Sequence, residues 1–95
     1  MCGICGVYNF SGKPVDEQVL IRMRDIMKHR GPNDAGIYID KYLGLGNRRL
    51  SIIDLSKSGH QPMLNEDNTI CISYNGEIYN YLSLRNNLIN KGYTF

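Results

Sequence analysis

The chain has 95 residues, enough for one small domain or for part of a larger one. Hydrophobic residues make up 42% and charged residues 21%, which indicates a soluble globular chain and excludes a disordered one. The net charge of +2 and the scattered basic residues do not favour binding to nucleic acid or to an anionic membrane surface.

The N-terminus lacks a basic segment followed by an apolar one, so we expect no signal peptide. No apolar run approaches the roughly 18 residues that a membrane-spanning helix needs. Three cysteines, an odd number, favour a reducing compartment, and we expect the chain in the cytoplasm.

The first third of the chain predicts a strand followed by an amphipathic helix. Residues 4–10 are β-branched and aromatic, which is typical of a strand. Asp16 is the expected N-cap of a helix that ends near residues 28–30, before a Gly-Pro pair. Its inward face should be the apolar residues at helical spacing, Val19, Leu20, Met23, Ile26 and Met27.

The remaining two thirds predict further strands and a second helix. Strands are expected at about residues 37–40, 43–47 and 69–74, and residues 93–95 are expected to begin another. Asn80 should cap a helix that Gly92 ends, and its inward residues should be Tyr81, Leu84 and Leu88. This mixed order with mostly antiparallel strands predicts an α+β fold with a thin core.

The opening Met1-Cys2-Gly3-Ile4-Cys5 is the first candidate for chemistry. A small second residue is the usual condition for removal of Met1, which would leave Cys2 with a free α-amine. A thiol has a reference pKa of about 8.5 and an α-amine one of about 7.7–8.0, so the amine can accept the thiol proton near neutral pH. A nucleophile and its base on one residue need no folded triad.

Two other interpretations of this opening stay open. Cys2 could have no chemical role, since any protein can carry cysteine at position two. Cys2 and Cys5 also have the spacing of a zinc or redox dithiol, but zinc would need further ligands. The remaining candidates for those ligands are widely spaced: His29, His60 and Cys71.

Four further stretches are rich in residues that build sites. They are His-Arg-Gly-Pro-Asn-Asp at 29–34, Arg-Leu-Ser-Ile-Ile-Asp at 49–54, Gly-His-Gln-Pro-Met at 59–63 and Asn-Gly-Glu-Ile-Tyr-Asn at 75–80. With the opening, this set closely resembles the N-terminal glutaminase domain of asparagine synthetases, a class II glutamine amidotransferase with an N-terminal nucleophile. The resemblance covers residues 1–95. It implies an incomplete Ntn-hydrolase-type αββα sandwich, with the synthetase domain absent from this chain.

The resemblance implies glutamine hydrolysis through a thioester on Cys2, with release of ammonia and glutamate. Asn75, through its side-chain NH2, and Gly76, through its backbone N–H, are expected to stabilise the oxyanion. Arg49 is expected to bind the glutamine α-carboxylate, because a guanidinium matches a carboxylate with two parallel hydrogen bonds. Glu77 corresponds to a residue that binds the substrate amino group, and the rest of the pocket should include Leu50, Ile52 and Ile53.

Several neighbouring residues are expected to lie outside the chemistry. Arg48 should point to the opposite side of the strand from Arg49, toward the surface. The resemblance gives His29 and His60 no role as a base, and we interpret both as structural. Asn33 stands where the family usually has aspartate, and a second amino-group ligand of the family lies past Phe95. No metal site is expected.

For the complete protein, the resemblance implies a second domain that uses ATP and Mg²⁺ to activate aspartate and receives the ammonia. Expected partners are therefore L-glutamine and a covalently attached synthetase domain, and a homodimer is a further option. One alternative is a relative that amidates another carboxylate. Another is a non-catalytic remnant of the domain, and the 95 residues alone are expected to be poorly active.

Overall fold

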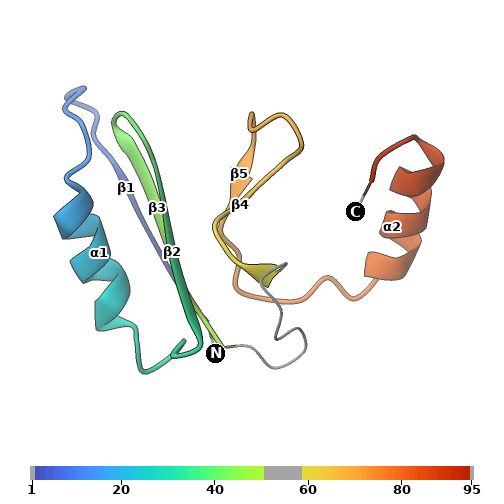
Figure 1. The fold of residues 1–95 in the computed structure, drawn as a ribbon, viewed down its shortest axis with the longest axis horizontal. Coiled ribbons are helices and arrows are strands. Elements are labelled where there is room, and N and C mark those ends of the chain that lie inside the picture. The colour runs from blue at the N-terminus through green and yellow to red at the C-terminus, as the bar shows by residue number, and fades with distance from the viewer. Residues whose placement is uncertain (1, 51–58, 95) are drawn as a thin grey trace.

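The computed structural model describes residues 2–50 and 59–94, which form an α+β arrangement of two helices and two antiparallel sheets (Figure 1). The α+β class and the antiparallel strands confirm the prediction. In chain order, the elements are β1 (Gly3–Tyr8), α1 (Glu17–Ile26), β2 (Asp34–Asp40), β3 (Leu43–Arg49), β4 (Met63–Leu64), β5 (Cys71–Ile72) and α2 (Tyr81–Asn90).

The three-stranded sheet has the order β1-β3-β2, and both pairings are antiparallel. Gly3 lies opposite Arg48 in the first pairing, and Asp34 lies opposite Arg49 in the second. The β2–β3 hairpin turns at Lys41, whose φ of 53° is left-handed. β2 begins three residues before the predicted strand because Asp34 to Gly36, poor strand formers by themselves, pair with the end of β3.

Helix α1 packs on one face of this sheet, where glycines allow close approach. Asp16 caps it as predicted, accepting a 2.9 Å hydrogen bond from the Gln18 N–H. Leu20 is fully buried, and a Cβ added to Gly44 would lie 3.0 Å from Leu20 Cδ2. The predicted inward stripe is too wide, because Val19 and Ile26 are 40% and 75% exposed.

The β4–β5 hairpin lies on the other side of the sheet, and α2 lies beyond it (Figure 1). Gly92 ends α2 with a φ of 95°, as predicted, and Asn80 takes the N-cap position without a side-chain hydrogen bond. The predicted inward face of α2 is wrong for the described residues. No residue of the helix is buried, and Tyr81, Leu84 and Leu88 are 57%, 44% and 37% exposed.

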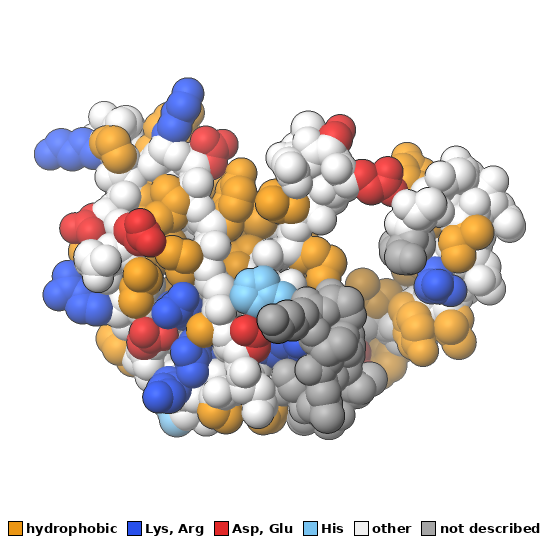
Figure 2. All heavy atoms as spheres, viewed as in Figure 1, with side chains coloured by type: hydrophobic (Ala, Val, Ile, Leu, Met, Phe, Trp, Pro, Cys, Tyr) orange, Lys and Arg blue, Asp and Glu red, His pale blue; other side chains and the backbone are white. Residues whose placement is uncertain are grey.

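Apolar side chains therefore remain at the surface on α2 and near it, as the orange spheres of Figure 2 show. Among the described residues, Leu20 is the one hydrophobic side chain that is fully buried, which confirms the thin core. The predicted last strand is absent from Tyr93 and Thr94. In the part of the chain that the structure describes, neither helix has the length and hydropathy to cross a bilayer.

Candidate active site

The pleat of the three-stranded sheet separates its side chains into two sets. The register and the close contacts assign one set to the α1 face and the other to the face that carries the 59–61 segment. On the α1 face lie Gly3, Cys5, Gly44, Gly46 and Arg48, and on the other face lie Cys2, Asp34, Gly36, Asn47 and Arg49. We call the second set the site face.

Cys2 lies at the start of β1 and is partly buried. Its Sγ is 3.4 Å from the Leu50 backbone nitrogen, which donates to it, and 3.9 Å from the Leu50 carbonyl oxygen. Gly3 pairs with Arg48, so continuing the register by one residue places Cys2 opposite Arg49. Cross-strand neighbours have Cβ atoms about 4.5–5.5 Å apart. Because Cys2 precedes β1 and Arg49 ends β3, this extended register places their backbones opposite each other at the end of the sheet.

The Arg49 side chain is turned into the protein, with an exposed fraction of 9%. Its guanidinium lies directly against Gly59, where an added Cβ would be 2.6 Å from Cζ and 3.0 Å from Nη1. Its backbone oxygen accepts a 3.0 Å hydrogen bond from the Asn33 N–H. The guanidinium is thus fixed under the 59–61 segment and faces the same side of the sheet as Cys2.

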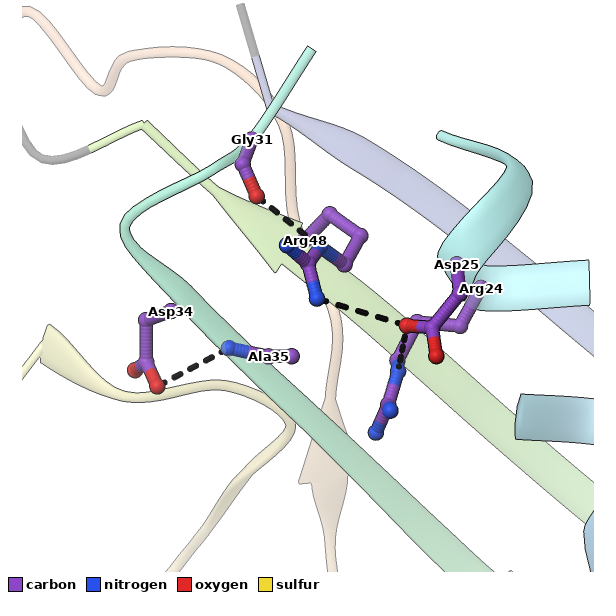
Figure 3. Close-up of polar contacts among 6 residues, drawn as sticks. All are labelled: Arg24, Asp25, Gly31, Asp34, Ala35 and Arg48. Carbon is purple, nitrogen blue, oxygen red and sulfur yellow. Dashed lines mark hydrogen bonds and ion pairs between the residues drawn. The ribbon is translucent and has the colours of Figure 1, made fainter. Parts of the chain in front are cut away.

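Asp34 adds a negative charge on the other side of Arg49. Its carboxylate bonds His60 Nδ1 at 2.6 Å. It also accepts a 2.9 Å hydrogen bond from the Ala35 N–H (Figure 3). Partial burial raises the pKa of Asp34, but the His60 bond, the Ala35 N–H and the charges of His60 and Arg49 together hold it below its ordinary value. Asp34 is therefore ionised at neutral pH and holds the His60 ring by this hydrogen bond.

Asn75, Gly76 and Glu77 follow β5 and are exposed. The hydrogen bonds that the structure shows for Cys2 go to Leu50 and do not involve them. The segment after β5 descends toward the end of the sheet where the N-terminus lies (Figure 1). A Cβ added to Gly76 would lie 2.8 Å from the Tyr74 hydroxyl oxygen, so the tyrosine ring covers this glycine.

Asn47 and Gln61 connect the site face to this segment, and the sequence analysis did not single out either side chain. Asn47, 1% exposed, donates from Nδ2 to Gln61 Oε1 at 3.2 Å and to Ser73 Oγ at 3.0 Å. Gln61 Oε1 also accepts the Tyr74 N–H at 2.6 Å. The available signal for Asn47 was a polar residue that directly follows the alternating leucines and glycines of β3. Gln61 lay in a stretch already noted as site-like.

Arg48 points to the α1 face, as predicted, but the prediction that it lies at the surface is wrong. It is 7% exposed, and its Nε donates to the Gly31 carbonyl at 2.9 Å while Nη1 lies 3.3 Å from Asp25 Oδ1 (Figure 3). Asp25 in the last turn of α1 supplies a carboxylate, and Gly31 after the helix supplies a carbonyl. Both compensate the buried charge of Arg48. Arg48 therefore holds the turn that leads into β2.

Cys5 lies on the opposite face of β1 from Cys2, because residues three apart in a strand point to opposite sides. Burial raises the pKa of Cys5, although Arg24 and the Gly46 backbone act in the other direction. The two sulfurs therefore do not face one metal ion or each other. No group of three metal-ligating side chains occurs within residues 2–50 and 59–94. Ile52 and Ile53 lie outside the described residues.

A sequence profile of the glutamine amidotransferase domain matches residues 1–95, and the chain belongs to this family. Curated relatives that it resembles include asparagine synthetases. The chain is 48% identical over 98 residues to glutamine-hydrolyzing asparagine synthetase 1 of Bacillus subtilis, a match that covers 100% of this chain and 15% of the relative.

Two more relatives come from distant organisms. The putative glutamine-hydrolyzing asparagine synthetase 2 of Methanocaldococcus jannaschii is 46% identical over 103 residues, covering 90% of this chain and 20% of that protein. Glutamine-hydrolyzing asparagine synthetase B of Escherichia coli is 38% identical over 86 residues, with shares of 90% and 15%. The chain thus spans a fifth or less of the length of each of these three relatives.

Proposed function

We propose that residues 1–95 are the N-terminal portion of a glutamine-hydrolysing domain that supplies ammonia to an ATP-dependent asparagine synthetase. The observation that carries the proposal is the contact between Cys2 Sγ and the Leu50 backbone, one residue past the buried Arg49. The similarity to asparagine synthetases over the whole chain supports the same assignment.

Removal of Met1 would convert Cys2 into a nucleophile that carries its own base. The α-amine takes the thiol proton, and the thiolate attacks the side-chain amide carbon of glutamine. The amine then gives a proton to the departing ammonia, which leaves a γ-glutamyl thioester on Sγ. Water, deprotonated by the amine, hydrolyses the thioester to glutamate and restores the thiol.

The oxyanion of each tetrahedral intermediate needs fixed hydrogen-bond donors. We assign these to the Asn75 side chain and the Gly76 N–H, which lie on the segment that Ser73 and Tyr74 anchor to the site face. Loss of one such donor reduces turnover by roughly 10²–10³-fold. Glu77, two residues past Asn75, is assigned to the substrate amino group.

Arg49 is assigned to the α-carboxylate of glutamine. The carboxylate carbon and the amide carbon are separated by four carbon–carbon bonds of about 1.5 Å, or about 5 Å when extended. A glutamine held by Arg49 therefore presents its amide carbon about this far from its carboxylate, and the separation of Arg49 and Cys2 has to accommodate that length. The pocket would include Leu50, whose N–H already bonds Cys2 Sγ, and also Ile52 and Ile53.

The layer order supports an incomplete Ntn-hydrolase-type αββα sandwich: α1, the three-stranded sheet, the β4–β5 hairpin and α2 follow one another across the molecule (Figure 1). The bare face of α2 would be covered by further parts of the domain. ATP and Mg²⁺ would be bound by a covalently attached synthetase domain, which receives the ammonia. We place the protein in the cytoplasm, and a homodimer is an option.

The proposed acceptor of the ammonia is aspartate, which the relatives favour over another carboxylate. The complete protein, incubated with each acceptor, ATP and glutamine, would distinguish the two by the amide that forms. A non-catalytic remnant would form neither amide and would retain Met1.

The decisive experiment uses Cys2→Ala in the complete protein that contains this chain. Glutamine-dependent amide formation should be abolished, while formation from added ammonia should stay largely intact. Cys5→Ala is the matched control, because it removes a thiol from the same strand on the opposite face. Equal loss of both activities in Cys2→Ala would contradict the proposed division of labour. Mass spectrometry of the intact N-terminus shows whether Met1 has been removed.

A further inference from the structure

The site face is connected to the segment before Asn75 by a partly buried polar network of three side chains. Asn47 of β3 donates from Nδ2 to Gln61 Oε1 and to Ser73 Oγ, at 3.2 and 3.0 Å. Ser73 Oγ in turn donates to the Gly46 carbonyl at 3.2 Å, and the Tyr74 N–H donates to Gln61 Oε1 at 2.6 Å. The network joins three parts of the chain that are far apart in the sequence.

The donors and acceptors of these hydrogen bonds show that the network holds the backbone of Tyr74. Gln61 Oε1 accepts two N–H donors, one from β3 and one from the backbone of Tyr74. Asn47 Oδ1 is buried and accepts no hydrogen bond from the described residues, so the two bonds of Nδ2 fix this side chain. A buried amide oxygen without a partner costs stability. The network therefore holds the Asn47 side chain and the 73–74 segment in place at a cost in folding stability.

The position that it fixes lies next to the proposed oxyanion donors. Ser73 and Tyr74 immediately precede Asn75 and Gly76, and the Asn47 backbone pairs with Ile4, two residues after Cys2. Cys2 is thus linked to Asn75 and Gly76 through the pairing of β1 with β3 and through the buried Asn47 side chain. The 59–61 segment is itself seated on the sheet, because a Cβ added to Gly36 would lie 2.8 Å from His60 Nε2 and would clash with the Gln61 carbonyl oxygen.

We propose that Asn47 and Gln61 are positioning residues that hold the 73–76 segment so that Asn75 and Gly76 face the carbonyl attacked by Cys2. The inference rests on the proposed glutaminase function and adds two residues to it. They act through Asn75 and Gly76 and do not touch the substrate. The effect belongs to the transition state, since the donors bind the oxygen most strongly when it is negatively charged.

The test measures glutamate formation from glutamine by the complete protein. Gln61→Met keeps the length of the side chain and removes the acceptor, whereas Gln61→Glu keeps an oxygen that can accept both N–H groups. We expect Gln61→Met to lower kcat by about 10- to 100-fold with KM changed by less than about 3-fold. Gln61→Glu should restore most of the loss. Gln18→Met, an exposed glutamine of α1 given the same substitution, should leave kcat unchanged.

A double-mutant cycle separates positioning from a general structural role. In an Asn75→Ala background, Gln61→Met should lower kcat by a smaller factor than it does in the wild-type protein, because one of the two donors that it positions is already gone. Equal losses in both backgrounds, or a change in KM alone, would overturn the proposal. If Gln61→Met lowers the Tm so far that it cannot be assayed, Ser73→Ala replaces it in the cycle, because it removes a single hydroxyl from the same network.

The cycle also distinguishes this inference from the function on which it rests. If Asn75→Ala alone leaves kcat unchanged, or if Cys2→Ala still hydrolyses glutamine, the proposed function fails. If both variants behave as expected and the cycle is additive, the glutaminase assignment stands and the positioning role of Asn47 and Gln61 is refuted.

Discussion

The contact between Gly59 and Arg49 leads to a prediction about substrate affinity. Gly59→Ala would place a methyl group 2.6 Å from Arg49 Cζ and 3.0 Å from Nη1. Ordinary carbon contacts are about 3.5–4.0 Å, so the guanidinium must retreat by about 1 Å. The backbone of Gly59 is not left-handed, and the group that must move is the far end of a flexible side chain. We therefore expect little loss of stability.

Under the proposed role of Arg49, the cost appears instead in glutamine binding. A guanidinium that has moved by about 1 Å cannot keep both parallel hydrogen bonds to the α-carboxylate. One charge-assisted hydrogen bond is worth about 1.5–3 kcal/mol, and each 1.4 kcal/mol is a factor of ten. Gly59→Ala should therefore raise KM for glutamine about 10- to 100-fold, with kcat within about 3-fold of the wild-type value.

Steady-state kinetics of glutamate release by the complete protein, together with a thermal melt, test this prediction. Gly6→Ala is the matched control, since its methyl would meet only the Gly44 carbonyl oxygen at 3.3 Å and Leu45 Cδ2 at 3.4 Å. An unchanged KM in a Gly59→Ala protein that melts normally would show that Arg49 does not bind the substrate carboxylate from this position. The assignment of Arg49 would then have to be abandoned.

Three further predictions concern stability and reactivity. Gly31→Ala should destabilise the domain by about 1–3 kcal/mol, because its methyl would clash with the Arg48 backbone, and a lower Tm would show it. The pKa of Asp34 in the folded protein lies below its unfolded value of about 3.9, so the ionised carboxylate stabilises the fold above about pH 4. That contribution is lost as the pH falls through the folded pKa. Asp34→Asn should therefore make the Tm fall less steeply at acid pH, and a Tm that falls equally in the variant and the wild type would contradict this. Burial raises the pKa of the Cys5 thiol, so iodoacetamide should alkylate it more slowly at pH 8 than a free thiol, as peptide mass mapping would reveal, and an equal rate would refute the effect.

The elements that follow from local rules could be predicted from the sequence. Asp16 caps α1 because a short carboxylate before an amphipathic run satisfies a free N–H, and Gly92 ends α2 because glycine tolerates a positive φ. The opposite orientations of Arg48 and Arg49 follow from the period of a strand. Local rules cover these features because each depends on residues within one turn or one strand.

The features that local rules missed depend on partners elsewhere in the chain. Arg48 is buried because the Gly31 carbonyl and Asp25 arrive from the end of α1. The apolar face of α2 is exposed because no described element packs on it closely enough to bury a residue. For the site, the sequence indicated Cys2 and Arg49, but the buried role of Asn47 needed the position of the 59–61 and 73–74 segments.

The alternation of Arg48 and Arg49 along β3 makes the strand intolerant of a shift in alignment. A deletion of one residue in the β2–β3 turn that slid β3 by one place would exchange the two guanidiniums, so that the anchor of α1 would enter the substrate pocket. The same slip would push Leu45 and Asn47 against α1, where Gly44 and Gly46 now leave room for Leu20 and Arg24. Length changes in this hairpin should therefore abolish folding and catalysis together, whereas the 65–68 turn, remote from both arginines, is the better place to insert a tag.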